Sequence, residues 1–315
     1  MERRFLGNTG IEVSRMCMGT LTMGPLQARL SPEEGAELIV QAYERGVTFF
    51  DTADLYGTYE HLALALRRIP RERVVIASRC YEYTYRGMKA AIHRALEALG
   101  TDYIDIFGLH EQETALTLSG HEDALLCAAD AKRAGTIRAV SVSTHAIEVV
   151  EALGDRHGVD VVHPIFNMRG IGIIDGHVEQ MAEAIRKVRA RGVGVYSMKP
   201  LGGGHLLKQA LQAIAWVLSN ECVDSMAIGV RDLRELEIDV ALVEGRPVDE
   251  GALQRIACDK RLFIEGWCLR CGRCVKACHQ GALRLGPSGL EVDHSRCVLC
   301  GYCVAQCRDF CIKVL

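Results

Sequence analysis

The stretch from Cys268 to Cys307 carries the feature that most limits how this chain can fold, a set of closely spaced cysteines. Eight of the 14 cysteines form two copies of the pattern C-x-x-C-x-x-C-x-x-x-C, which begin at Cys268 and at Cys297. Three thiolates separated by two residues each can surround one face of an iron–sulfur cubane, while a fourth, further along, points elsewhere. The spacing therefore favours iron–sulfur clusters.

This double motif resembles that of the two-cluster bacterial ferredoxins, in which the fourth cysteine of each motif ligates the other cluster. The resemblance implies two [4Fe–4S] clusters with crossed ligands. The first cluster would be held by Cys268, Cys271, Cys274 and Cys307. The second cluster would be held by Cys297, Cys300, Cys303 and Cys278.

Two other interpretations of these cysteines fit the spacing less well. Zinc takes four ligands, usually as two separated pairs, so two tight triplets with trailing cysteines would oversupply it. A disulfide framework requires an oxidising compartment, which nothing in the sequence indicates. His279 and Arg308 stand where the ferredoxin motif has proline, a change expected to alter the reduction potential but not the ligand count. Cys311 is expected to be a small buried residue of a closing strand, with competition for a ligand position as the alternative.

Ahead of the cysteines, apolar runs typical of buried strands alternate with amphipathic runs typical of helices. A short hairpin is predicted at Asn8-Thr9-Gly10, where glycine suits a tight turn. Eight strands are then predicted over Arg15–Thr20, Val47–Phe50, Val74–Ser78, Ile104–Leu109, Ile137–Val142, Val159–Pro164, Val193–Met198 and Met226–Val230. Each precedes a predicted helix, over Pro32–Gly46, His61–Ile69, Arg86–Leu99, Glu122–Ala134, Ala146–Leu153, Val178–Arg191, Leu206–Leu218 and Leu233–Val243.

Eight strand–helix units of this kind fit an α/β fold, a closed (β/α)8 TIM barrel with a small C-terminal α+β ferredoxin-like domain. A doubly wound open sheet is the alternative, but no G-x-G-x-x-G follows the first strand as a Rossmann fold would require. We expect the barrel over residues 1–245, a linker over 246–258 and the ferredoxin-like domain over 259–315.

Charge and composition limit the partners and the compartment. The net charge of −3 argues against nucleic acid, and no apolar run approaches membrane-spanning length. Because the N-terminus also lacks a signal-peptide pattern, thiolate-bound clusters predict a reducing cytoplasm. From Asp259 onward, nine Lys and Arg stand against five Asp and Glu. This basic balance suits either an acidic electron-carrier protein or an ordinary solvated surface.

Ionisable side chains collect where the predicted strands end, which is where barrel enzymes place their active sites. In chain order they are Asp51, Tyr56, Arg79 and His110. Taken singly, each has an ordinary structural explanation, as a capping carboxylate, a packing aromatic, a surface cation or a core histidine. Their succession at neighbouring strand ends favours an active site, with His145 and His163 as further candidates to line it.

At these positions the motifs D-T-A-x-x-Y-G, a strand ending L-H, and Y-S-x-x-P-L resemble the aldo/keto reductase family over about residues 1–245. Chains that join this barrel to a ferredoxin-like domain form an iron–sulfur branch of the family. The resemblance implies an oxidoreductase acting on a small-molecule carbonyl or alcohol, with a catalytic tetrad of Asp, Tyr, Lys and His. Asp51, Tyr56 and His110 match three of the four positions.

The fourth position differs, because Arg79 stands where the family has lysine. The cation there lowers the tyrosine pKa from about 10, which lets Tyr56 give a proton near neutral pH. Arginine supplies charge but cannot release a proton, and its wider planar head can displace the tyrosine. We expect weakened or altered activity if proton relay through the cation matters, with Lys199 at the end of strand 7 as a candidate substitute.

The resemblance also implies that NADP(H) lies across the barrel mouth, with nicotinamide contacts from Ser143, Asn167 and Tyr196. The loop and helix after strand 8 would hold the adenosine phosphates. Gly229 and the helix start suit a phosphate there, and Arg231 would meet the 2′-phosphate. The family's usual I-P-[KG] opening and E-N closing of this region are absent.

Three hypotheses for function follow. In the first, the barrel reduces a carbonyl or oxidises an alcohol with NADP(H), and the clusters accompany or couple to this reaction. In the second, the clusters pass single electrons to the substrate without nicotinamide, because a hydride carries two electrons and no flavin motif is present to convert between them. In the third, the clusters form a redox-sensing or docking module on a barrel with little catalysis.

Overall fold

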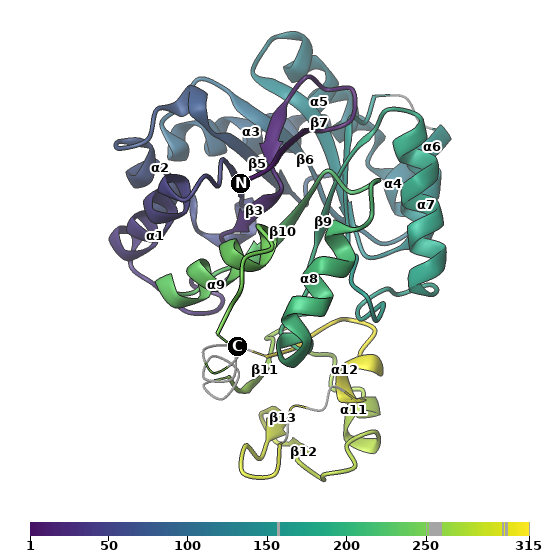
Figure 1. The fold of residues 1–315 in the computed structure, drawn as a ribbon. Coiled ribbons are helices and arrows are strands. Elements are labelled where there is room, and N and C mark those ends of the chain that lie inside the picture. Colours follow the sequence, from purple (N-terminus) through teal and green to yellow (C-terminus); the bar gives the residue numbers. More distant parts are fainter. Residues whose placement is uncertain (156–157, 250, 252–259, 298, 300–301, 315) are drawn as a thin grey trace.

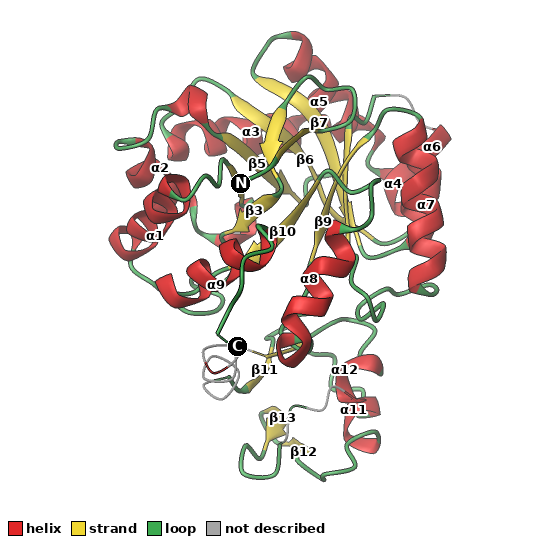
Figure 2. Ribbon diagram, in the orientation of Figure 1, coloured by secondary structure: helices red, strands yellow, loops and turns green. Residues whose placement is uncertain are grey.

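The computed structural model describes residues 1–155, 158–249, 251, 260–297, 299 and 302–314. Eight parallel strands within this range close into a barrel surrounded by helices (Figures 1 and 2). The predicted (β/α)8 fold is therefore confirmed. The barrel strands are β3 (Met16–Gly19), β4 (Phe49–Asp51), β5 (Val75–Cys80), β6 (Ile104–Gln112), β7 (Ile137–Thr144), β8 (Val161–Pro164), β9 (Gly194–Met198) and β10 (Ser225–Gly229).

The outer helices follow the strands in the predicted order. They are α1 (Pro32–Glu44), α2 (Tyr59–Leu66), α3 (Tyr85–Leu99), α4 (Ala115–Gly120), α5 (Glu122–Arg133), α6 (Ile147–Asp155), α7 (Val178–Ala190), α8 (Ala210–Leu218) and α9 (Leu233–Val243). Helix α1 begins as its sequence predicts, because Ser31 and Glu34 form a reciprocal capping box and Pro32 occupies the first turn. No helix in the described ranges has the length and hydropathy to span a bilayer.

Two cores stabilise the barrel. The larger lies between the strands and the outer helices. The smaller fills the barrel interior and includes Phe49, Ile106 and Tyr196. The predicted N-terminal hairpin, β1 (Arg3–Phe5) with β2 (Glu12–Ser14), adds apolar side chains to this inner core and closes the amino end of the barrel. The opposite, carboxyl end is therefore the open one.

The C-terminal elements form a small α+β unit at that open end (Figure 1). Strand β11 (Leu262–Ile264) pairs with β14 (Ile312–Val314), and β12 (Leu283–Gly286) pairs with β13 (Gly289–Val292). Two short helices, α11 (Arg273–Lys276) and α12 (Tyr302–Ala305), lie between the strand pairs in sequence. Of the predicted linker 246–258, residues 250 and 252–258 lie outside the described residues.

The last strand of this unit packs directly on the barrel. The backbone N–H of Val314 donates to the carbonyl of Gly203, 2.9 Å away, in the loop that follows β9. A Cβ on Gly204 would lie 2.2 Å from the carbonyl oxygen of Val314, and a Cβ on Gly172 would lie 2.8 Å from the Phe310 ring. Glycine is required at these positions, both of which have positive φ, because the two backbones approach so closely.

The structure differs from the sequence-based prediction in the stretch after strand 4. The strand continues to Gln112 through a bulge, with Glu111 at a φ of 41°, so His110 lies within β6 and not at its end. Between the predicted strand Ile104–Leu109 and the predicted helix Glu122–Ala134, the structure adds helix α4, which Thr114 caps through the backbone of Thr117. Helix α4 is too short to show the periodic apolar pattern by which longer helices are predicted from a sequence.

Candidate functional site

A cavity of about 510 Å³ opens at the carboxyl end of the barrel, a volume typical of small-molecule sites. Its walls come from both parts of the chain. The barrel contributes the four predicted catalytic residues, Asp51, Tyr56, Arg79 and His110. The C-terminal unit contributes Lys260, Glu265, Trp267, Lys313 and Val314. The predicted tetrad positions are thus brought together, and the small domain forms part of the wall opposite them.

Asp51 and Arg79 form a buried ion pair at the floor of the cavity. Asp51 ends β4 and Arg79 lies near the end of the neighbouring strand β5, so the two side chains point to the same place. The guanidinium also donates to the Tyr196 hydroxyl at 3.2 Å, and that hydroxyl donates to Asp51 Oδ2 at 3.0 Å. Burial raises the pKa of Asp51, and the adjacent guanidinium opposes that rise.

Tyr56 is presented by a short 3-10 turn, Asp54–Tyr56, that ends at Gly57 with a φ of 65°. Its ring contacts His110 edge-on, with centroids 5.6 Å apart, and the Arg79 guanidinium carbon lies 5.8 Å from its centroid. Desolvation raises the pKa of Tyr56 to about 12, despite the opposing charge of Arg79. The phenol is therefore protonated at neutral pH and can act as a proton donor.

His110 lies beside that phenol and carries no charge near neutral pH. Burial and the charge of Arg79 lower the pKa of its imidazole to about 3. The ring stacks on Tyr81 with centroids 4.4 Å apart, and its Nδ1 has no hydrogen-bond partner among the described residues. A neutral imidazole next to a protonated phenol can hydrogen-bond a carbonyl oxygen without competing for its proton.

The residues predicted to contact nicotinamide lie beneath the cavity instead of lining it. Ser143, Asn167 and Tyr196 are at most 1% exposed. The Ser143 hydroxyl accepts from the backbone N–H of Glu111 at 2.8 Å, and Asn167 holds its own loop by hydrogen bonds to Ile171. Their predicted role in cofactor contact stays a prediction, whereas each has a structural role that the geometry shows.

His163 is the aromatic residue that lines the cavity in this region, and Tyr196 stacks against it with ring centroids 3.9 Å apart. The family resemblance implies that Tyr196 contacts the nicotinamide. The register of β9, however, places Tyr196 in the inner barrel core with Phe49 and Val161.

The predicted phosphate end of the cavity contains acidic side chains. Gly229 lines the cavity, but Arg231 does not and lies 3.5 Å from the Glu235 carboxylate instead. The backbone N–H of Arg231 also donates to Glu235 at 2.9 Å, and Lys260 forms an ion pair with the same carboxylate. Asp239, one turn along α9, is buried and lines the cavity as well, so a phosphate dianion would meet two acidic groups.

The backbone N–H of Arg231 and the ammonium group of Lys260, two donors at this end of the cavity, are both paired with the carboxylate of Glu235. Carboxylates accept hydrogen bonds from hydroxyl groups, so the pair Glu235 and Asp239 suits free ribose hydroxyls instead. Burial together with the charge of Glu235 raises the pKa of Asp239.

The cavity wall also contains residues that the sequence motifs do not single out, among them Tyr81, Glu111, Glu265 and Lys313. Lys199 had been considered as a substitute for the missing lysine of the tetrad. Its ammonium group instead donates to His145 Nε2 at 2.8 Å and lies 3.9 Å from Glu111. Arg79, and not Lys199, pairs with Asp51.

The cysteines assigned to the first cluster surround a small hollow in the C-terminal unit. Cys268, Cys271, Cys274 and Cys307 all line it, as does Cys311. The hollow and its four thiols fit a [4Fe–4S] cluster, whose iron atoms thiolates ligate. Of the second set, Cys278, Cys297 and Cys303 are described, and Cys300 lies outside the described residues. The assignment of that second set stays a prediction.

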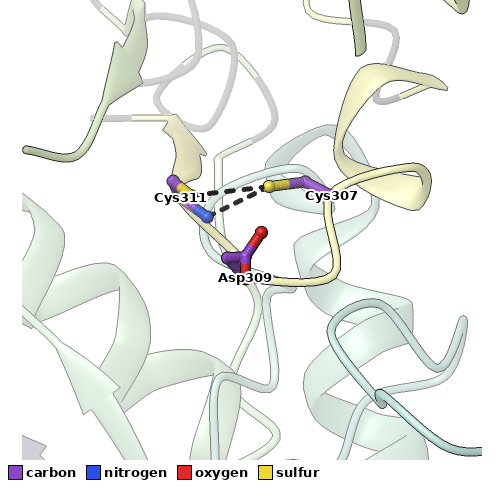
Figure 3. Close-up of side chains that lie close together, drawn as sticks. All are labelled: Cys307, Asp309 and Cys311. Carbon is purple, nitrogen blue, oxygen red and sulfur yellow. Dashed lines mark hydrogen bonds between the residues drawn. The ribbon is translucent and has the colours of Figure 1, made fainter. Parts of the chain in front are cut away.

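Figure 3 shows how the chain turns back over Cys307. The backbone N–H of Cys311 donates to Cys307 Sγ at 3.3 Å, and the two sulfur atoms lie 3.7 Å apart. A similar contact occurs in the other motif, where the N–H of Ala282 donates to Cys278 Sγ at 3.2 Å. Such N–H donors to thiolate sulfur are among the features that set cluster potentials. Cys311 is 1% exposed and precedes β14, as expected for a buried residue of a closing strand.

The hollow of the first cluster lies close to the cavity along the chain. Trp267 lines the cavity, and the next residue, Cys268, lines the hollow. On the other side, Phe310 contacts His145 of the barrel edge-on with centroids 5.5 Å apart, three residues after Cys307. The two sites therefore share the same two segments of the small domain.

Comparisons with known proteins agree with this architecture. The profile of the Aldo/keto reductase family matches residues 15–214, and that of a 4Fe-4S dicluster domain matches residues 267–310. L-galactose dehydrogenase from Arabidopsis thaliana is 23% identical over 300 residues, which span 81% of this chain and 93% of that protein. Versiconal hemiacetal acetate reductase from Aspergillus parasiticus is 26% identical over 282 residues, 78% of this chain and 79% of that protein.

Solved structures show the same barrel. An aldo-keto reductase from Bacillus halodurans, in its holo form, superposes with a TM-score of 0.64 at 19% identity, over 82% of this chain and 96% of that one. A thermostable aldo-keto reductase in complex with the inhibitor epalrestat gives 0.65 at 22% identity, over 82% and 99%. With the family profile covering most of the barrel, the chain belongs to the aldo/keto reductase family and carries a C-terminal 4Fe-4S dicluster domain.

Proposed function

We propose that this oxidoreductase reduces a small carbonyl compound to the alcohol, with Tyr56 as the proton donor. The observation that supports this most directly is the pairing, in one cavity, of a protonated phenol with the neutral imidazole of His110. The carbonyl oxygen would accept hydrogen bonds from both groups. This arrangement polarises the carbonyl group before any electrons arrive.

A nicotinamide dinucleotide, when bound, would supply the hydride that adds to the carbonyl carbon. The electron pair of the C=O double bond then moves to oxygen, which takes the proton of Tyr56. Arg79 stabilises the phenolate that forms, because its charge lies over the Tyr56 ring. Asp51 and Tyr196 hold the guanidinium in place. Solvent returns the proton to Tyr56, because Arg79 cannot.

Of the two nicotinamide dinucleotides, the acidic pair Glu235 and Asp239 favours the one without a 2′-phosphate. We therefore propose NAD(H) in place of the NADP(H) implied by the family. Glu235 and Asp239 would accept hydrogen bonds from ribose hydroxyls, and Gly229 lets the dinucleotide approach the backbone of the β10 end. The direct test is the ratio of dissociation constants for NADH and NADPH, measured by fluorescence titration of the cluster-loaded protein.

A second candidate function follows from the position of Trp267 between the cavity and Cys268. Two [4Fe–4S] clusters would each deliver one electron, so that a carbonyl takes two electrons and two protons to give the alcohol. The reductant would be a low-potential electron-carrier protein with an acidic face, matching the basic balance of the small domain. This route requires no nicotinamide.

One anaerobic experiment separates these possibilities. The cluster-loaded protein is mixed with NADH, with NADPH or with dithionite, and cluster reduction is followed by EPR while alcohol formation from an aldehyde is measured. Alcohol formed with NADH while the clusters stay oxidised supports hydride transfer. Alcohol formed only from dithionite-reduced clusters supports the single-electron route. A protein that forms no alcohol under either condition would overturn both and leave the clusters as a sensing or docking module.

A further inference from the structure

Two lysines from different domains meet at the cavity wall. Lys199 follows β9 of the barrel, and Lys313 is the central residue of β14 in the cluster domain. Both line the cavity. Lys199 has a φ of 56°, an unusual conformation for a residue with a side chain and one often found at functional sites.

The ring of Phe310 brings the two ammonium groups together. Lys199 Nζ lies 4.5 Å and Lys313 Nζ 3.4 Å from its centroid. Burial and the nearby charge of Lys199 lower the pKa of Lys313, so the charged form of Lys313 is costly without an anion. Lys313 donates to the carbonyl oxygen of Phe310. The contacts to Phe310 fix both lysines in space, because the ring is itself only 2% exposed.

Of the two lysines, Lys199 alone has a carboxylate within ion-pair distance among the described residues. Lys313 is 5% exposed, and no carboxylate in the described ranges forms an ion pair with it. The nearest acidic oxygen recorded for Lys199 is that of Glu111, at 3.9 Å. A buried ammonium without a close counter-charge is costly, and a bound anion would remove that cost.

Two acidic groups face the same space and must be considered. Glu111 accepts a hydrogen bond from Tyr81 at 2.9 Å, so part of its charge is already engaged. Glu265 is 4% exposed, and its Oε1 has no hydrogen-bond partner in the described part of the chain. Burial raises the pKa of Glu265. In its protonated form this group donates a hydrogen bond to an anion and does not repel it.

We propose that Lys199 and Lys313 together form an anion-binding site, shared between the barrel and the cluster domain, for a carboxylate or phosphate group. This site lies in the wall of the cavity that contains Tyr56. The anionic group that it binds therefore belongs to the substrate or to the dinucleotide. This inference rests on the proposed function, and it identifies the substrate as a carbonyl compound that carries a carboxylate. The alternative source of the bound anionic group is the pyrophosphate of a dinucleotide.

The test measures binding without turnover, so it is independent of whether the carbonyl reaction takes place. Benzoate and its neutral isostere benzamide are titrated into the cluster-loaded protein by anaerobic calorimetry, and ADP is titrated as a pyrophosphate probe. The variants are Lys199→Gln and Lys313→Gln, each of which removes the positive charge and keeps a polar side chain. Lys276→Gln and Lys208→Gln remove exposed lysines of the same two domains and serve as matched controls.

We expect each site variant to bind benzoate about tenfold or more weakly than the parent, while benzamide binding changes little. Weaker binding of ADP with unchanged benzoate affinity would instead identify the anion as the dinucleotide pyrophosphate. Both results support the shared anion site. Unchanged affinity for both anions in the two site variants would overturn it, provided that the EPR spectra and melting temperatures show intact clusters and fold.

Discussion

Arg79 donates to Tyr196 through Nη1, at 3.2 Å, and to the carboxylate of Asp51 through Nη2. One guanidinium therefore joins three strands at the floor of the cavity, β4, β5 and β9. A lysine at position 79 would keep the charge but has a single nitrogen, which cannot reach both partners in the same geometry. The lysine that the family usually places here is thus not equivalent to Arg79 in this chain.

Replacing Arg79 therefore has a clear cost. Arg79→Met leaves Asp51 as a buried carboxylate without a cation and is expected to lower the free energy of unfolding by about 3–5 kcal/mol. Arg79→Lys should lower it by about 1–3 kcal/mol, because one buried polar partner loses its hydrogen bond. Anaerobic denaturant unfolding measures both changes. The double variant Asp51→Asn with Arg79→Met should recover part of the loss, whereas equal loss in the double and single variants would contradict the pairing.

Tyr56 is expected to be the proton donor, so Tyr56→Phe should lower the rate of carbonyl reduction by about 10²–10⁴-fold. Its affinity for benzoate should change far less, because the lysines bind that ligand. Tyr81→Phe is the matched control, since Tyr81 also lines the cavity and stacks on His110. A Tyr56→Phe protein that keeps parental activity would remove Tyr56 from the proposed mechanism.

The pH dependence follows from the two shifted groups. The pKa of Tyr56 is raised to about 12, so the phenol keeps its proton throughout the neutral range. The pKa of His110 is lowered to about 3, so its imidazole gains a proton only in strong acid. The rate of the reduction step should therefore be nearly flat between about pH 5 and pH 9. The reverse oxidation needs the phenolate, so the rate of oxidation should rise with pH across the same range. A bell-shaped pH profile of the reduction rate, centred near pH 7, would argue against these assignments.

The choice of dinucleotide should depend on Glu235. Glu235→Gln removes the negative charge beside the expected ribose and should raise the affinity for NADPH relative to NADH by about tenfold. Glu237→Gln is the control, because Glu237 lies on the exposed face of the same helix. Fluorescence titration with both dinucleotides gives the ratio. A parent protein that already prefers NADPH, with no response to the substitution, would refute the assignment of Glu235.

The contact between the two domains depends on Gly204. Gly204→Ala would place a Cβ 2.2 Å from the carbonyl of Val314, at a φ of 89°. Gly245→Ala introduces a similar backbone strain at a φ of 67° but with no atom within 4 Å, so it isolates the cost of conformation alone. We expect the first variant to increase the exposure of Trp267, which is 47% exposed in the parent, and to shift its fluorescence to longer wavelength, while the second leaves the emission unchanged. Identical spectra for both variants would show that β14 does not need this close approach.

Much of the barrel could be predicted because periodicity and strand ends are local properties of the sequence. The eight strands, the capping box at Ser31 and the position of Asp51 and Tyr56 all follow from neighbouring residues. The extent of β6 past His110 could not be predicted, because it depends on a bulge and on pairing with Thr144 far along the chain.

The parts of the site that the sequence did not reveal arise from packing between distant segments. Lys313 and Glu265 reach the cavity only because β14 docks on the loop after β9. Likewise, Arg231 matched a phosphate-binding pattern, but the neighbouring Glu235 turns back onto its backbone and removes the free donors. Sequence motifs identify which residue types are present, whereas these contacts decide which of them face the ligand.

The hydrogen bond from the Val314 N–H to the Gly203 carbonyl joins the cluster domain to the barrel. Loss of the clusters therefore also affects the barrel. Small metal domains commonly unfold when they lose their metal, and Lys260, Glu265, Trp267, Lys313 and Val314 of this domain line the cavity. Oxygen damage to the clusters would therefore also dismantle substrate recognition. Aerobic conditions would therefore inactivate the enzyme as a whole. They would not leave an active barrel with an open cavity.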